Sequence, residues 1–311
     1  MTEENNIPMM KKWMVAARPF SFTASTTAVL LGAAIAYHSG HSISWGLLGL
    51  TLLGVICFHT AANLINDIFD YKRGLDTEVM PTSGAVVRGW LTERQVFSAA
   101  FTLIAIGCVC GLLLVREAGF VILGLGIVGV IIVLFYTGSG MCLKYMGLGD
   151  LAIFIAFALL PVFGAYWVQV QEFSWKPFVW CFPLGSYTVA ILHANNWRDI
   201  ESDKANSCTT MASMLGPAGS RVYYRLLVIG PFALVAAYVV AAMVMNYRSY
   251  APLMALISFL ALPLALKLAS AKDDNRELGF LMLDGRTAQT QLVFGLLLPL
   301  SFVLSRLLNI N

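Results

Sequence analysis

The chain has 311 residues, of which 59% are hydrophobic and 12% charged, and its mean hydropathy is +0.76. Soluble domains carry about 25% charged residues, so this composition excludes a soluble globular protein and indicates an all-α integral membrane protein. The net charge of +3 is too small to favour nucleic acid as a partner. The six cysteines lack the paired spacing of a zinc site or a disulfide framework.

Nine stretches of the chain are apolar and close to the length of about 20 residues that a membrane-spanning helix needs. They cover residues 20–38, 46–65, 96–115, 119–137, 149–169, 176–196, 222–246, 250–269 and 287–307. We therefore expect one polytopic domain, residues 1–311, embedded in the lipid bilayer. Two of the connections, residues 71–94 and 197–220, are long and polar.

The basic residues are distributed unevenly between the two sides that nine spans define. With the N-terminus in the cytoplasm, sixteen of the twenty Lys and Arg fall on the cytoplasmic side and four on the other. Because basic residues concentrate in cytoplasmic loops, this distribution predicts a multi-pass protein of the cell (inner) membrane. Both long polar connections are then cytoplasmic.

A polar cluster closes the second span, from Asn63 to Asp76. Asn66 and Asp70 are one helical turn apart in sequence, so on a helix they share one face. Gly74 is expected to end the helix, and Asp76 follows in the loop, from where its carboxylate could fold back toward Asp70. Asp67 is expected to point elsewhere.

A second cluster repeats this spacing at the end of the sixth span. Asn195 and Asp199 stand at the same separation as Asn66 and Asp70, and Asp203 follows one turn later. These three side chains are expected to stack on one helical face. Glu201 is expected to face away from them.

Carboxylate and amide oxygens are hard ligands that suit Mg²⁺, which proteins commonly hold with a few carboxylates and substrate phosphates. The candidate metal-binding and catalytic residues are Asn66, Asp70, Asp76, Asp199 and Asp203. A diphosphate bridged by Mg²⁺ would also explain the neighbouring basic residues, which are Lys72, Arg73, Lys144, Arg198 and Lys204. Taken alone, Lys72 and Arg73 fit a topology signal better than a ligand role.

Further candidates for substrate binding lie on the same side of the membrane. Asn195 is one turn before Asp199. His193 is interpreted first as a structural histidine and second as part of an acceptor pocket. Most of the aromatic residues here fit the interfacial belt, but Tyr136 and Tyr145 flank the 138–147 turn and could stabilise a carbocation through their ring faces.

Several of these segments together resemble a UbiA-type membrane prenyltransferase. The resemblance covers almost the whole chain and is greatest to the branch that prenylates 1,4-dihydroxy-2-naphthoate, the MenA-like enzymes and their vertebrate menaquinone-forming relatives. The segments that carry it are Ala17–Phe22, Asn63–Asp76, Tyr136–Gly138, Lys144–Tyr145, Leu148–Asp150, Ile191–Asp203 and Asp284–Gln289.

The resemblance implies nine helices around a central cavity that opens sideways to lipid. It also implies Mg²⁺-dependent transfer of a polyprenyl group from a polyprenyl diphosphate to an aromatic acceptor, with 1,4-dihydroxy-2-naphthoate favoured, in menaquinone biosynthesis. By position, the five candidate ligands would bind Mg²⁺–diphosphate, and Arg198, Lys144 and Lys204 would contact phosphate. The chain departs from many relatives at Thr82-Ser83, near an expected Asp-Arg pair. It also departs from many bacterial relatives at Cys208-Thr209, where they have Lys-Arg, although the vertebrate branch is apolar there as well.

Three alternatives remain at this point. The chain could act on another aromatic acceptor, or it could be a catalytically silent relative that binds quinone or prenyl diphosphate, for which the two departures are the motive. It could also be an ion-coupled transporter, since acids inside membranes mark ion pathways. Transport sites usually lie near the membrane midplane, whereas these acids cluster at one interface.

Overall fold

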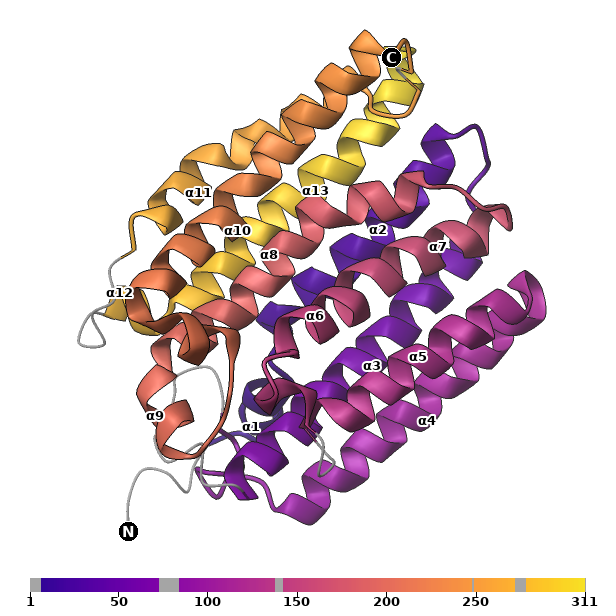
Figure 1. The fold of residues 1–311 in the computed structure, drawn as a ribbon. Helices are drawn as coiled ribbons and strands as arrows, with labels where there is room; N and C mark the ends of the chain where they lie inside the picture. The colour runs from indigo at the N-terminus through magenta and orange to yellow at the C-terminus, as the bar shows by residue number, and fades with distance from the viewer. Residues whose placement is uncertain (1–6, 73–83, 138–141, 248, 272–277, 311) are drawn as a thin grey trace.

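The structure is a computed structural model that describes residues 7–72, 84–137, 142–247, 249–271 and 278–310. Within these residues the fold is a bundle of long helices that run roughly side by side (Figure 1). Seven helices are long and apolar enough to cross a membrane, and two shorter apolar helices, Phe120–Tyr136 and Leu253–Ala269, fall on the fourth and eighth expected spans. The expected all-helical membrane fold is confirmed.

The N-terminal third begins with α1 (Met9–Ala17), the short η2 (Pro19–Ser21) and α2 (Phe22–His38). Arg18 separates α1 from α2 with a left-handed backbone, φ 52°, and Pro19, which lacks a backbone donor, starts the next segment. The helix α3 (Trp45–Lys72) follows and carries the whole described part of the first polar cluster. Asn66 and Asp70 are therefore helical, as expected.

The middle of the chain starts with α4 (Glu93–Ala118), capped by reciprocal hydrogen bonds between Thr92 and Gln95. Gly119, at φ 81°, turns the chain into α5 (Phe120–Thr137). The short η3 (Leu143–Tyr145) precedes α6 (Gly149–Phe154), which continues through the π-helical turn η4 (Ile155–Leu159) into α7 (Leu160–Val170). Single π turns inside α-helices are frequent at functional sites.

The last part contains α8 (Lys176–Arg198), α9 (Ile200–Ala205), α10 (Met211–Val244), η5 (Leu253–Ala261), α11 (Leu262–Ala269), α12 (Leu278–Leu281) and α13 (Leu283–Leu308). The connection 197–220, which the sequence suggested to be a long polar loop, is largely helical. It holds α9 and the first turns of α10, which break at Gly216 (φ 67°) before Pro217.

Four groups of buried hydrophobic residues hold the described part of the bundle together, and two of them lie next to the polar clusters. The larger one joins α2, α7, α8, α10, α11 and α13 around Trp180, Tyr187 and Phe294, all fully buried. The smaller one joins α1, α3, α4 and residues 85–91. The first polar cluster therefore belongs to one core and the second cluster to the other. Both clusters lie at the end of the bundle where α1, α9 and α12 gather (Figure 1).

Candidate active site

A cavity of about 460 Å³ opens between the two cores at this end of the bundle. Its walls come from η2, α2, α3, α5, η3, α6, η4, α8, α9, α12 and α13. The ionisable residues that line it are His59, Arg18, Asp70, Tyr136, Lys144, Arg198, Asp199, Glu201, Asp203 and Asp284. Fixed positive and negative charges thus meet in one partly enclosed space, as a site for a metal-bound anion requires.

Asp70 is a buried carboxylate of the first cluster with several side-chain partners. It is 4% exposed, and the Lys144 ammonium donates to both its oxygens at 2.9 and 2.8 Å. The Tyr145 hydroxyl donates to it at 2.5 Å, and the Asn66 amide at 2.8 Å. The hydrogen bond between Asn66 and Asp70 confirms that the two share a helical face.

Asp67 points away from this group, as expected from its place one residue after Asn66. Its carboxylate is fully buried and pairs with Arg18 at 3.3 Å. It also accepts hydrogen bonds from the backbone N–H groups of Gly84 and Val86. Asp67 therefore anchors the segment after the first cluster and orients Arg18, whose side chain lines the cavity.

The second cluster is organised around Arg198 and Asp199, which are adjacent in sequence. The Arg198 guanidinium donates to both Asp199 oxygens at 2.9 and 3.0 Å, and to the Asn195 side-chain oxygen at 2.6 Å. A fourth hydrogen bond reaches the Leu281 carbonyl in α12. This two-pronged geometry is the strong form of an Arg–carboxylate pair.

Asp203 completes the second cluster from α9. It is buried and accepts a hydrogen bond from the Thr210 hydroxyl at 3.1 Å. Burial raises the pKa of Asp203 to about 6, with Lys144 lowering it and Asp199 and Asp70 raising it further. Because Asp203 lines the same cavity as Asp70 and Lys144, the two clusters face a common space.

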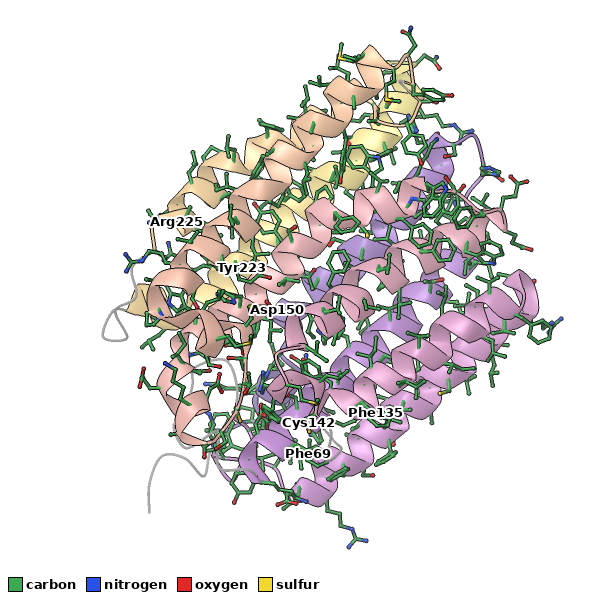
Figure 2. All side chains as sticks on the ribbon, viewed as in Figure 1. Phe69, Phe135, Cys142, Asp150, Tyr223 and Arg225 are labelled. Carbon is green, nitrogen blue, oxygen red and sulfur yellow. The ribbon has the colours of Figure 1, made fainter. Side chains whose placement is uncertain are left out.

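A backbone bridge ties the middle segment to the second cluster. The Thr209 N–H donates to the Tyr145 carbonyl at 3.1 Å, and the Gly147 N–H donates to the Thr209 carbonyl at 2.7 Å. Figure 2 labels Cys142, which comes just before η3 in the chain. The bridge fixes the segment that carries Lys144 and Tyr145, both of which contact Asp70, so Thr209 has a structural role here.

The structure brings most of the predicted residues together. Those that line the cavity are Asn66, Asp70, Tyr136, Lys144, Asn195, Arg198, Asp199 and Asp203. Tyr145 does not line it but contacts Asp70 directly. Asp76, Arg73 and the Thr82-Ser83 pair lie outside the described residues.

Three predicted substrate-binding residues lie away from the cavity. Lys72 pairs with Glu93 at 2.8 Å on the surface, and Lys204 is exposed on α9. His193 is fully buried in α8, where its ring packs edge-on against Tyr223, 4.7 Å between centroids. Figure 2 labels Tyr223, which belongs to α10, so the His193 ring lies between α8 and α10 and not on the cavity wall.

The expected orientation of Glu201 is wrong. Glu201 lines the cavity, because the helix does not run on unbroken after Arg198: α8 ends there, and Asp199 leaves helical geometry before α9 begins. Arg18 and Asp284 also line the cavity and were not predicted as site residues. The Arg18-Pro19 pair, a helix break beside a span, was the available signal for the first of these.

The chemistry of these residues fits Mg²⁺, provided that substrate phosphates and waters supply the remaining ligands. All the donors are hard oxygens, but among the described residues no three His, Cys, Asp or Glu side chains lie close enough to hold one metal ion by themselves. Mg²⁺ is commonly bound by one or two carboxylates together with substrate phosphates and waters. Asp70 on one wall, and Asp199 and Asp203 on the other, match that arrangement.

The fold and the site define a polytopic membrane protein with a charged cavity at one end of its helix bundle. A profile of the UbiA prenyltransferase family matches residues 26–288, and the chain belongs to this family, whose members are enzymes that transfer prenyl groups.

The chain is similar to vertebrate proteins that carry one name. "UbiA prenyltransferase domain-containing protein 1" of Mus musculus is 33% identical over 94% of this chain and 84% of its own length. The Danio rerio protein of that name is 38% identical over 71% of this chain and 66% of its own length.

Among solved structures, the apo UbiA homologue of Aeropyrum pernix has a TM-score of 0.67 at 16% identity, over 91% of this chain and 98% of that one. The Archaeoglobus fulgidus homologue bound to DMAPP and Mg²⁺ has a TM-score of 0.59 at 15% identity, over 92% and 98%. At these identities the structures show the fold alone.

Proposed function

We propose that this enzyme transfers a polyprenyl group from a polyprenyl diphosphate to an aromatic acceptor, with Mg²⁺ as cofactor. The observation that carries the proposal is the meeting of two acidic clusters, far apart in sequence, with Lys144, Arg18 and Arg198 in one cavity. A diphosphate with its metal contains both signs of charge and satisfies both sets of side chains.

The pairing of the ionic groups supports an exchange of partners on binding. Asp70 is held by Lys144, and Asp199 by Arg198. With donor present, Asp70, Asp199 and Asp203 would hold the metal, and Lys144 and Arg198 would turn to phosphate oxygens. Bound Mg²⁺ would supply electrostatic stabilisation of the charge that grows on the leaving diphosphate. The Archaeoglobus homologue, bound to DMAPP and Mg²⁺, supports this assignment by analogy.

The remaining walls of the cavity suit an allylic cation and an aromatic ring. Tyr136 and Phe157 line it, and their ring faces can stabilise positive charge. Ile132, Ile153 and Leu192 cover other parts of its wall and would exclude water, which limits hydrolysis of the cation. The chain's own side chains would thus bind, orient and shield the reacting groups.

We propose 1,4-dihydroxy-2-naphthoate as the acceptor, and menaquinone biosynthesis as the pathway. The segment from Ile191 to Asp203 lies on the cavity at Asn195, Asn196 and Asp199, and it carries the resemblance to the naphthoquinone branch. The similarity to the vertebrate relatives, 33% identical over most of the chain, supports the same choice. Another aromatic acceptor is the competing outcome.

We propose that the site faces the cytoplasm of a cell that carries the protein in its inner membrane. The sixteen-to-four distribution of basic residues supports this orientation. In a chain without other cysteines, Ser207→Cys, next to α9, should be protected from an impermeant thiol reagent applied to intact cells. Labelling from outside would show that the protein has the opposite orientation in the membrane.

The function is tested with purified protein, a panel of prenyl diphosphates and a panel of aromatic acids, with lipid-soluble products identified by mass spectrometry. The expected product is a prenylated naphthoquinone precursor that disappears on chelation and returns with Mg²⁺. Activity that survives thorough chelation would contradict the assignment of Mg²⁺ as cofactor. A product formed from a different aromatic ring would show that the acceptor is not 1,4-dihydroxy-2-naphthoate.

A further inference from the structure

A second, apolar groove of about 170 Å³ lies beside the charged cavity. It lies between α3, α4, α5, η4 and α7. His59, Val133, Ala156 and Phe157 line both spaces, so the two lie next to each other and share part of their walls. Ala156 and Phe157 belong to the π-helical turn η4, which places the irregular backbone at the junction.

The groove offers no unsatisfied polar side chain among the described residues that line it. Only Thr51 and His59 are polar there. The Thr51 hydroxyl donates to the Leu47 carbonyl of its own helix at 2.8 Å. The two His59 ring nitrogens pair with the hydroxyls of Ser25 at 2.9 Å and Ser21 at 3.1 Å. The groove is therefore suited to a hydrocarbon ligand, which needs no hydrogen bonds.

Glycines line much of the groove, and four of them fall into two kinds. A Cβ atom on Gly107 would meet the Phe58 ring at 2.9 Å, and one on Gly54 would meet Cys110 at 3.2 Å. These two glycines permit close packing of α3 against α4. A Cβ on Gly126 meets no atom within 4 Å, and one on Gly129 meets only Leu160, at 3.9 Å. Gly126 and Gly129 of α5 thus leave space that their neighbours do not use.

We propose that this groove holds the distal isoprene units of the donor, and that Gly126 and Gly129 set the length of prenyl chain the enzyme accepts. The inference rests on the proposed function, because it takes the diphosphate end of the donor to lie in the charged cavity. One molecule with an anionic head and a linear run of apolar units spans both spaces. A free lipid acyl chain would need only the groove.

The two glycines act as specificity-determining positions through their missing side chains. On a helix, residues 126 and 129 lie on one face with Ile122, Leu125 and Val133, all of which line the groove. Gly124 lies on the same helix, lines neither space, and a Cβ there also meets nothing within 4 Å. Gly124 is therefore a matched control, with the same helix, the same residue type and the same gain in helix propensity on substitution.

The test compares Gly126→Leu with Gly124→Leu in the purified full-length protein, using Mg²⁺ and donors of one, two, three and four isoprene units. For the four-unit donor, Gly126→Leu should lower kcat/KM at least about tenfold relative to Gly124→Leu, because even two excluded methylene groups account for that factor. For the one-unit donor the two variants should agree within about twofold. Gly126→Ala should lie between.

A binding measurement separates this inference from the proposed function. The rise in melting temperature that Mg²⁺ and each donor confer should increase with chain length in the wild type and stop increasing in Gly126→Leu. If the wild type binds donors but does not transfer them, the proposed function is wrong. The inference about the groove is then still tested by this binding measurement. Equal losses for all donors in Gly126→Leu, or the same chain-length profile in Gly124→Leu, would overturn the inference.

Discussion

Asp70 and Asp199 occupy matching positions in the two polar clusters, but the protein holds their carboxylates in different ways. Asp70 is buried, and its partners Lys144 and Tyr145 come from a segment that lies far from it in sequence. The Asp199 side chain is 37% exposed, and its partner is the adjacent Arg198. The first carboxylate therefore depends on the assembly of the bundle, whereas the second is held by its own helix end.

This difference separates stability from catalysis. Removing one member of a buried ion pair leaves an uncompensated charge and is strongly destabilising. In the Arg198–Asp199 pair only the carboxylate is exposed, at 37%, and the Arg198 guanidinium also donates to Asn195 and Leu281, so it keeps hydrogen-bond partners when the carboxylate is removed. If both carboxylates hold the same metal-bound diphosphate, their loss should be equally damaging to turnover and unequally damaging to the fold.

The largest expected effect is on turnover in Asp70→Asn and Asp199→Asn. Each change removes one negative charge at the metal, and the loss of preorganised stabilisation costs at least about 10²-fold in kcat. Asp70→Asn should also lower the melting temperature, because Lys144 loses its counter-charge and the lost carboxylate is itself buried. Asp199→Asn should lower it less, because the carboxylate is partly exposed and Arg198 keeps its hydrogen bonds to Asn195 and Leu281. Both are measured in detergent by product formation and thermal unfolding.

Glu93→Gln is the matched control, since it removes an exposed carboxylate that pairs with Lys72 outside the cavity. It should keep wild-type turnover. An active Asp70→Asn variant, or equal thermal losses in Asp70→Asn and Asp199→Asn, would contradict the contrast between the two clusters.

The pH dependence gives a second, smaller effect. The folded-state pKa of Asp203 is raised from 3.8 to about 6, so in the ligand-free protein this group stabilises the fold at low pH and that contribution is lost as pH rises through 6. Metal binding needs the ionised carboxylate, so the affinity for Mg²⁺ should rise with pH over the range in which the stability of the ligand-free fold falls. The thermal stabilisation by Mg²⁺ and donor should therefore grow between about pH 5 and pH 7.

Comparison of Asp203→Asn with the wild type isolates the titration of Asp203, because the diphosphate of the donor titrates in the same way with both proteins. The variant should bind Mg²⁺ and donor more weakly and show a flatter pH dependence. A variant with the wild-type pH profile would assign the titration to another group.

The helix-face arguments from the sequence succeeded where the backbone is regular. The spacing of Asn66 and Asp70 predicted their shared face, which their hydrogen bond confirms. The same argument failed for Glu201, because the break at Asp199 lies within the pattern and has no proline or glycine to reveal it. Periodicity is informative only while the helix continues.

The partners across the bundle could not be derived from spacing. Lys72 and Lys144 are both basic residues near the first cluster in the predicted topology, but only Lys144 reaches Asp70, because the bridge from Thr209 to Tyr145 and Gly147 fixes its segment. The apolar groove could not be predicted from the sequence either, because a glycine in a membrane helix does not indicate which face of the helix lines a cavity. These features arise from tertiary packing.

Thr210→Ala should have a moderate effect. The Thr210 hydroxyl caps α10 by accepting from the Ser213 N–H and donates to Asp203. Loss of such a cap costs about 1 kcal/mol of folding free energy, and Asp203 would lose an orienting donor, so Mg²⁺-dependent donor binding should weaken. Thr210→Ser should restore both. Failure of this rescue would show that the hydroxyl is not the relevant group.

The smallest effect is expected for Lys204→Gln. Because Lys204 is exposed on α9 and does not line the cavity, kcat/KM should stay within about twofold of the wild type, as for other surface substitutions. A loss as large as that of Lys144→Gln, measured in parallel, would return Lys204 to the phosphate-binding set.

The central claim is that both clusters act on one metal-bound diphosphate, and a double-mutant cycle on kcat tests it most directly. The single variants Asp70→Asn and Asp199→Asn are compared with the double variant under saturating Mg²⁺ and donor. Residues that act as a unit are strongly non-additive, so the double variant should be scarcely slower than either single one. Effects that multiply, as two independent sites would give, would contradict the account.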